Sequence, residues 1–187
     1  PSLHGLVARS GGVLPPNRDA APYRRAGVGE GGYGPLRNAG PELALPAGFT
    51  YTVVSKAGKP MSDGNPTPNA FDGMAAFPLP NGTIRLIRNH ENRDPAFASG
   101  VKGDPATAYD AKGGGGTTSL ELRVAADGTP ELVRDFVSLN GTIVNCAGGP
   151  TSWGSWLTCE ESTEGKANGW EQEHGYIFEV PAASEGP

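Results

Sequence analysis

Short apolar runs separated by turn residues recur along most of the chain. Within the runs, aromatic and β-branched residues are common and often alternate with polar ones, which is typical of β-strands, and no convincing 3.6-residue helical period is present. The pattern predicts strands at residues 48–55, 74–77, 83–89, 117–124, 131–139, 153–159 and 175–180. Seven or so closely spaced strands predict an all-β antiparallel fold, either a β-propeller or a β-sandwich, with any helix short and confined to a loop.

Turn residues between these runs predict how the strands are connected. Asn81-Gly82 supplies the positive φ angles of a tight hairpin, residues 126–128 predict a second hairpin, and Asn140-Gly141 predicts a further turn. Asp63-Gly64 and Asp72-Gly73 are interpreted as ordinary turn residues. Hairpins about every 40 residues match the blade repeat of a propeller, although no repeated sequence signature accompanies them.

Composition and apolar pattern distinguish the first 40 residues from the rest of the chain. Gly (29 residues) and Pro (18) make up about a quarter of the 187 residues, which suits either disorder or a turn-rich β fold, and the recurring apolar runs favour the β fold. Residues 1–40 lack a periodic apolar pattern and predict an extended N-terminal arm, whereas residues 41–187 predict one folded domain. A predicted loop at 92–116 ends in four glycines, 113–116, which suit a close approach of the backbone to another group.

Charge and hydropathy argue against several classes of partner. Lys and Arg total 15 against 20 Asp and Glu, so the net charge of −5 gives no basic footprint for nucleic acid or anionic lipid. No run is long enough to cross a membrane or to form the apolar core of a signal peptide, and we expect the chain to be soluble. The pair Arg24-Arg25 is followed by a glycine-rich stretch, which does not suit a twin-arginine export signal.

Two stretches place several potential ligands close together in the sequence. Arg88-Asn89-His90-Glu91 ends a predicted strand, where neighbouring side chains point to opposite faces, so a shared site for His90 and Glu91 would need a turn of the backbone. A solvated strand end explains the same residues. The acidic pair Glu160-Glu161 suits calcium, which needs many oxygen ligands, and an acidic surface loop is the alternative.

The two cysteines allow two interpretations. A bridge from Cys146 to Cys159 would stabilise the chain by about 3 kcal/mol on the chain-entropy model. Alternatively, Cys146, which precedes small residues at 147–149, could approach a metal as a thiolate. Three well-separated histidines argue against a zinc site built on histidine, and the sequence contains no P-loop, HExxH or GxSxG motif.

Taken together and in order, several short motifs between about residues 32 and 180 resemble the PhoX-type alkaline phosphatases and their twin-arginine-exported relatives. The motifs are GYGPL (32–36), LPAGF (45–49), MSDG (61–64), DGMA (72–75), RNHE (88–91), GGTT (115–118), LNGT (139–142), NCAGGP (145–150), WG (153–154), LTCEE (157–161) and HGY (174–176).

The resemblance implies a six-bladed propeller that holds ferric iron and calcium ions joined by an oxide and hydrolyses phosphate monoesters with a metal-bound oxide or hydroxide. It implies that Cys146 is an iron ligand, that Glu91, Glu160 and Glu161 are carboxylate ligands, and that Asn145 contacts the phosphate. The ligand role of Cys146 is thereby favoured over the bridge. It also implies a periplasmic or secreted location and a small phosphate ester as the substrate.

The sequence departs from that family in length, because the later blades and their ligands are not among these 187 residues. We therefore expect a fragment, a chain completed by a separate piece of the same propeller, or a shortened homologue. Two other functions stay open. One is a non-catalytic, calcium-stabilised propeller that binds a ligand or partner, and the other is a calcium-dependent lactonase or phosphotriesterase.

Overall fold

The structure is a computed structural model that describes residues 33–93 and 99–187. These residues belong to two compact units, which meet in the sequence between Val53 and Val54. The first contains a short antiparallel pair, β1 (Arg37–Asn38) with β2 (Ala44–Leu45). Most of the predicted N-terminal arm, including Arg24-Arg25, lies outside the described residues, and the boundary at residue 40 stays a prediction.

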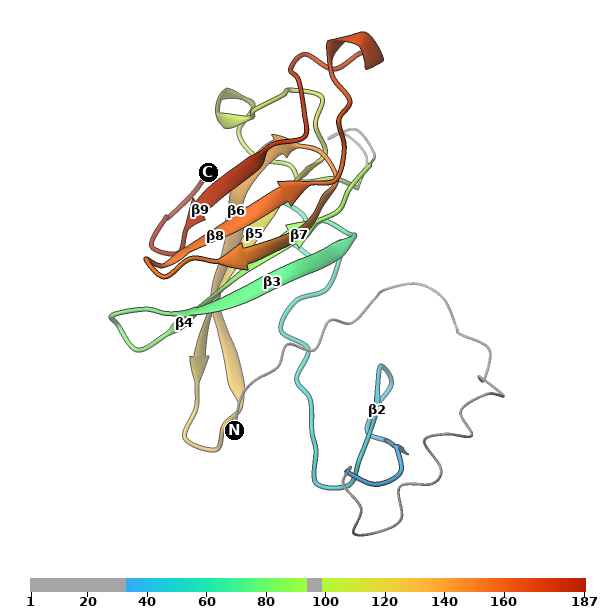
Figure 1. The fold of residues 1–187 in the computed structure, drawn as a ribbon. Helices are drawn as coiled ribbons and strands as arrows, with labels where there is room; N and C mark the ends of the chain where they lie inside the picture. The colour runs from blue at the N-terminus through green and yellow to red at the C-terminus, as the bar shows by residue number, and fades with distance from the viewer. Residues whose placement is uncertain (1–32, 94–98) are drawn as a thin grey trace. The chain divides into compact units, whose positions relative to one another are not determined.

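The second unit begins with a four-stranded antiparallel sheet (Figure 1). Its strands are β3 (Phe71–Pro78), β4 (Ile84–His90), β5 (Gly115–Val124) and β6 (Pro130–Thr142), and neighbours in the chain are neighbours in the sheet. Both predicted hairpins are confirmed. Within the first turn Gly82 has a φ of 82°, whereas Asn81 keeps a negative φ and accepts hydrogen bonds from the backbone and side chain of Thr83.

A three-stranded antiparallel sheet follows, in the order β7 (Asn145–Pro150), β8 (Ser155–Glu160) and β9 (Ile177–Pro181). The strands β8 and β9 were predicted from their apolar pattern and β7 was not. Two 3-10 helices, η2 (Pro105–Thr107) and η3 (Lys166–Asn168), lie in loops as expected. The all-β antiparallel prediction is confirmed. The described strands form open sheets without a closed barrel or propeller, so the propeller stays a prediction.

Three local predictions are wrong. The strand predicted at residues 48–55 is not formed, since these residues pair with no described strand. Asn140-Gly141 lies inside β6, where Tyr109 and Asp110 donate their backbone N–H groups to the carbonyls of Asn140 and Gly141. Asp72-Gly73 lies inside β3 instead of a turn.

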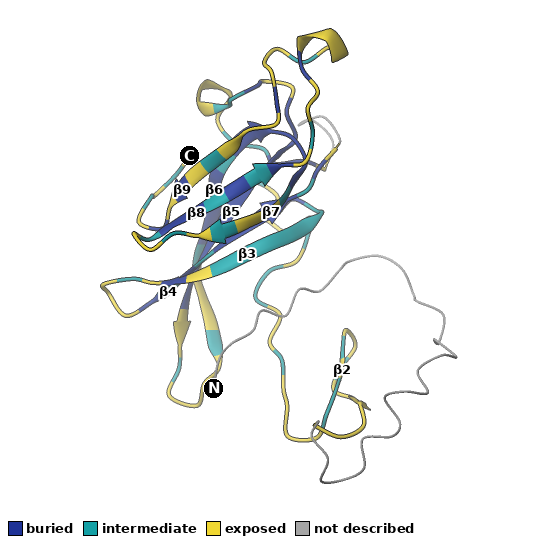
Figure 2. Cartoon of the chain, in the orientation of Figure 1, coloured by how far each residue is buried: buried dark blue, intermediate teal, exposed yellow. Residues whose placement is uncertain are grey.

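Buried residues concentrate in β4, β5 and the second half of β6, as Figure 2 shows. The two sheets of this unit share a core of residues from β3, β4, β8, β9 and the segment after β9: Phe77, Ile87, Trp156, Val180 and Ala182. Burying each larger side chain contributes about 1.5–3 kcal/mol. The core thus holds β8 and β9 against β3 and β4, and β7, which pairs with β8, is positioned with them.

The predicted glycine run ends in the first residues of β5, which lie close to β6 and β7. A Cβ on Gly115 would lie 2.5 Å from Asn145 Oδ1, and one on Gly116 would collide with the carbonyl oxygen of Leu139. The expected close approach of the backbone is confirmed. In the described residues, no helix has the length and hydropathy of a membrane span.

Candidate metal centre

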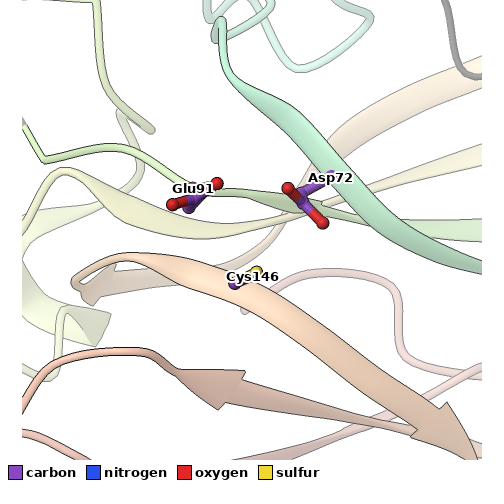
Figure 3. Close-up of side chains that lie close together, drawn as sticks. All are labelled: Asp72, Glu91 and Cys146. Carbon is purple, nitrogen blue, oxygen red and sulfur yellow. The ribbon is translucent and has the colours of Figure 1, made fainter.

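Three side chains converge where β3, the end of β4 and β7 meet (Figure 3). Asp72 lies on β3, Glu91 directly follows β4, and Cys146 lies on β7. One ligand atom from each lies within 4.8 Å of the others, and all three residues are half-buried. A thiol and two carboxylates at this separation could hold one metal ion.

A glycine and a buried amide bring β7 to this position. A Cβ at Gly73 would lie 2.8 Å from the carbonyl oxygen of Cys146, so only glycine allows this approach without displacement. From β4, the buried Asn89 donates through Nδ2 to the carbonyls of Cys146 (2.9 Å) and Ala147 (3.0 Å). Its Oδ1 accepts from Trp156 Nε1 at 2.8 Å, which ties the site to the core.

Backbone strain also concentrates around these residues. Ala70 and Val144, each with a φ of 52°, are the described non-glycine residues with positive φ, and each stands two residues before a ligand candidate. The carbonyl of Ala70 accepts from Glu91 N at 2.8 Å, and Val144 N donates to the carbonyl of Asn92 at 3.1 Å. Such conformations cost about 1–3 kcal/mol each and cluster at functional sites.

The electrostatics of the group favour a cation. Burial raises the pKa of the Cys146 thiol, and the carboxylates of Asp72, Glu161 and Glu91 raise it further. The exposed Arg93 donates to Glu91 Oε1 at 2.9 Å. A metal ion would stabilise the thiolate by compensating the surrounding negative charge.

The structure therefore brings Glu91 and Cys146 together, and the negative charge of Glu161 acts on the Cys146 thiol. It adds Asp72, which the sequence had suggested only as a turn residue. A signal was present, since Asp72 belongs to the DGMA motif of the resemblance. Both cysteines are free thiols, so the alternative bridge between Cys146 and Cys159 is not formed.

Glu160 is engaged elsewhere. Its side chain is fully buried and accepts four hydrogen bonds. Oε1 accepts from Ile143 N (2.9 Å) and His174 Nδ1 (2.7 Å), while Oε2 accepts from Gly175 N (2.7 Å) and Tyr176 N (3.1 Å). It is not part of the three-residue group, and its role as a ligand stays a prediction.

Asn145 and His90 also have their polar groups engaged inside the protein. Asn145 accepts from Thr142 Oγ1 at 2.5 Å and donates to Thr158 Oγ1 at 3.0 Å, so a contact with phosphate stays a prediction. His90 contacts the carbonyl of Asn69 and the hydroxyl of Thr118. Burial and then the charge of Arg88 lower its pKa to about 3, so His90 is neutral.

These features define an antiparallel β protein with a mixed thiol and carboxylate centre between two sheets. The family model described as alkaline phosphatase PhoX matches residues 31–134 and 116–186. The chain belongs to this family, and the resemblance found in the sequence is confirmed. No curated protein and no solved structure gave a match.

Proposed function

We propose that this protein is a metal-dependent phosphatase that hydrolyses phosphate monoesters. The observation that carries the proposal is the convergence of Asp72, Glu91 and Cys146, which come from three separate segments of a chain of the PhoX family. Family membership supports phosphatase chemistry, and the three-residue group supports its dependence on metal.

The donor set fits ferric iron together with calcium. Thiolate is a soft ligand that suits iron and has little place in an all-oxygen calcium site, whereas carboxylates suit both ions. Cys146, Asp72 and Glu91 would hold iron, and Glu161 would add a carboxylate for iron or calcium. When bound, the ions would supply positive charge for the phosphate oxygens and lower the pKa of a coordinated water.

The residues of the chain would orient the ligands and make substrate binding depend on metal. Asn89 and Gly73 fix the position of Cys146, so the ligands need little rearrangement. Without cations, the carboxylates of Asp72, Glu91 and Glu161 would repel a phosphate ester. The arrangement requires no side-chain nucleophile.

We also propose that β3–β6 and β7–β9 are blades of a β-propeller, that its remaining blades supply further ligands, and that the protein works in the periplasm or outside the cell. Antiparallel sheets of four and three strands in chain order support the architecture. Family membership supports the location.

The test is hydrolysis of p-nitrophenyl phosphate by the protein loaded with iron and calcium, before and after treatment with a chelator. We expect chelation to abolish turnover and both metals to restore it. Cys146→Ser should lower kcat at least about 100-fold, while the matched control Cys159→Ser should stay within about twofold. Turnover unaffected by chelation would refute the mechanism.

Two other results would point to the alternative functions. Hydrolysis of a lactone or phosphotriester with calcium alone would indicate the calcium-dependent hydrolase. Calcium binding that raises the melting temperature, without hydrolysis of any ester, would indicate a non-catalytic protein.

A further inference from the structure

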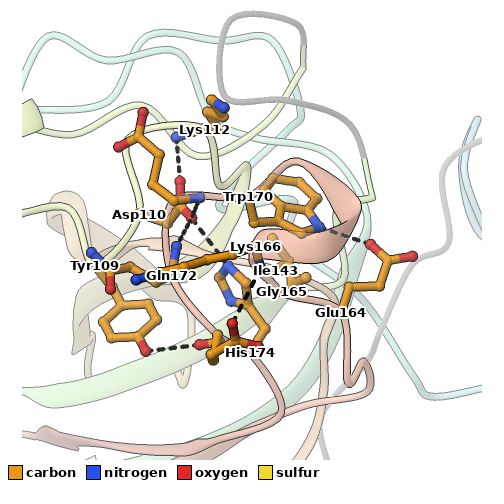
Figure 4. A network of polar contacts seen from close by, with 12 residues as sticks. Tyr109, Asp110, Lys112, Ile143, Glu164, Gly165, Lys166, Trp170, Gln172 and His174 are labelled. Carbon is orange, nitrogen blue, oxygen red and sulfur yellow. Dashed lines mark hydrogen bonds and ion pairs between the residues drawn. The ribbon is translucent and has the colours of Figure 1, made fainter.

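A second buried polar group is connected to the segment that leads into β7. Figure 4 shows His174 and Asp110 within this network. The imidazole of His174 lies between two carboxylates, with Nδ1 2.7 Å from Glu160 Oε1 and Nε2 3.4 Å from Asp110 Oδ2. All three side chains are inaccessible to solvent.

This group connects four segments of the chain. Asp110 is fixed to β6 by its backbone N–H, which donates to the carbonyl of Gly141 at 3.0 Å. Its Oδ2 accepts from the backbone N–H groups of Glu171 (2.7 Å) and Gln172 (2.8 Å). These bonds set the position of the loop that carries His174, and His174 in turn orients Glu160.

Glu160 in turn forms a hydrogen bond with the segment that leads into β7. Its Oε1 accepts from Ile143 N at 2.9 Å, and the next residue, Val144, has the positive φ described above. The carbonyl of Val144 accepts from Glu161 N at 2.9 Å. Cys146 follows two residues later. The hydrogen bonds of Glu160 therefore fix the backbone from which Cys146 and Glu161 approach the centre.

We propose that Glu160 and His174 are positioning residues, which hold the strained Ile143–Val144 segment so that Cys146 and Glu161 are presented to the metal. The inference rests on the proposed function and assigns to Glu160 a role other than that of a ligand. The side chains of Glu160, His174 and Asp110 are buried away from water, so the hydrogen bonds among them are strong and hold them rigidly. Because Glu160 accepts four hydrogen bonds, it has little freedom to turn toward the metal.

The experiment uses Co²⁺ as a probe, because a thiolate bound to cobalt gives a charge-transfer absorption that reports the Cys146–metal contact. In wild type this band should appear on titration and be absent in Cys146→Ser. Glu160→Gln replaces one acceptor oxygen with an amide group, and His174→Ala removes the donor to Glu160. Both should weaken cobalt affinity at least about tenfold.

Two further variants separate positioning from general loss of structure. In His174→Asn the side-chain amide can replace Nδ1 as the donor to Glu160, so affinity should recover to within about threefold of wild type. Glu164→Gln changes an exposed carboxylate of the same loop, which accepts from Trp170 Nε1, and should leave affinity unchanged. Equal affinity in wild type, Glu160→Gln and His174→Ala would overturn the positioning role and leave the proposed function intact.

Amide hydrogen exchange in metal-free protein gives a readout that does not depend on metal. In Glu160→Gln, exchange should accelerate at least about tenfold at Val144 and Glu161, neither of whose amides bonds directly to the altered side chain. Unchanged exchange at both would overturn the proposal. If wild type shows no cobalt band, the proposed function fails, and the exchange rates still decide whether Glu160 holds this segment.

Discussion

Gly73→Ala tests the close contact on which the metal centre depends. The new methyl group would lie 2.8 Å from the carbonyl oxygen of Cys146 and 3.3 Å from both Asn89 Nδ2 and the ring of Trp156. Ordinary van der Waals contacts begin at 3.4 Å, so β7 has to move away from β3 by roughly 0.6 Å.

The size of the effect follows from two contributions. Overpacking of this kind costs about 1–3 kcal/mol. Moving the carbonyl of Cys146 also weakens its hydrogen bond with the buried Asn89, which adds about 1 kcal/mol. We expect the free energy of unfolding to fall by about 2–4 kcal/mol in total, which lowers the melting temperature by about 5–15 °C in a protein of this size.

The assay is thermal unfolding followed by circular dichroism, together with a metal titration. The matched control is Gly149→Ala on the same strand, where a Cβ would meet nothing within 4 Å. The control should change stability by less than about 0.5 kcal/mol. Metal affinity of Gly73→Ala should fall about tenfold, because Cys146 is displaced from its partners. If the two variants unfold at the same temperature, β7 does not pack against β3 as described.

Two further predictions concern the core and the pH dependence of stability. Trp156→Phe removes the 2.8 Å hydrogen bond to Asn89 Oδ1 and leaves that buried oxygen without its donor. The free energy of unfolding, measured in urea, should therefore fall by about 1–3 kcal/mol. The control Trp153→Phe, at an exposed site, should change it by less than about 0.5 kcal/mol. Hydrogen bonds, led by that from Thr83, lower the pKa of Glu121 from 4.5 to about 2. Its ionised form therefore stabilises the fold above pH 4.5 by up to about 3 kcal/mol, and this contribution is lost as the pH falls toward 2. The stability gap between wild type and Glu121→Gln should shrink over that range, and a constant gap in acid denaturation would contradict the prediction.

The hairpins could be predicted from the sequence because their signals are local. The runs that became β4, β5 and β6 contain alternating apolar residues, and glycine occurs in each of their turns. Strand β7 could not be found in this way. Its sequence, NCAGGP, has almost no strand propensity, and pairing with β8 together with the hydrogen bonds from Asn89 makes it a strand.

The candidate site shows the same division between local and long-range causes. The sequence suggested Glu160 and Glu161 as a pair of ligands because they are adjacent. At the end of a strand, however, adjacent side chains point to opposite faces, and Glu160 turns inward to His174 while Glu161 lies near Cys146. The contribution of Asp72 depends on which strand lies opposite β3, and no local pattern carries that information.

The distribution of the three ligands has a consequence for folding. Asp72 belongs to the four-stranded sheet, Glu91 directly follows it, and Cys146 belongs to the three-stranded sheet, so an ion bound by all three would cross-link Cys146 to residues at least 55 positions away in the chain. Metal at 100 times its dissociation constant would stabilise the native state by about 2.7 kcal/mol. Resistance of this protein to proteolysis should therefore follow the supply of metal, and the loaded form should be cut more slowly than the stripped form.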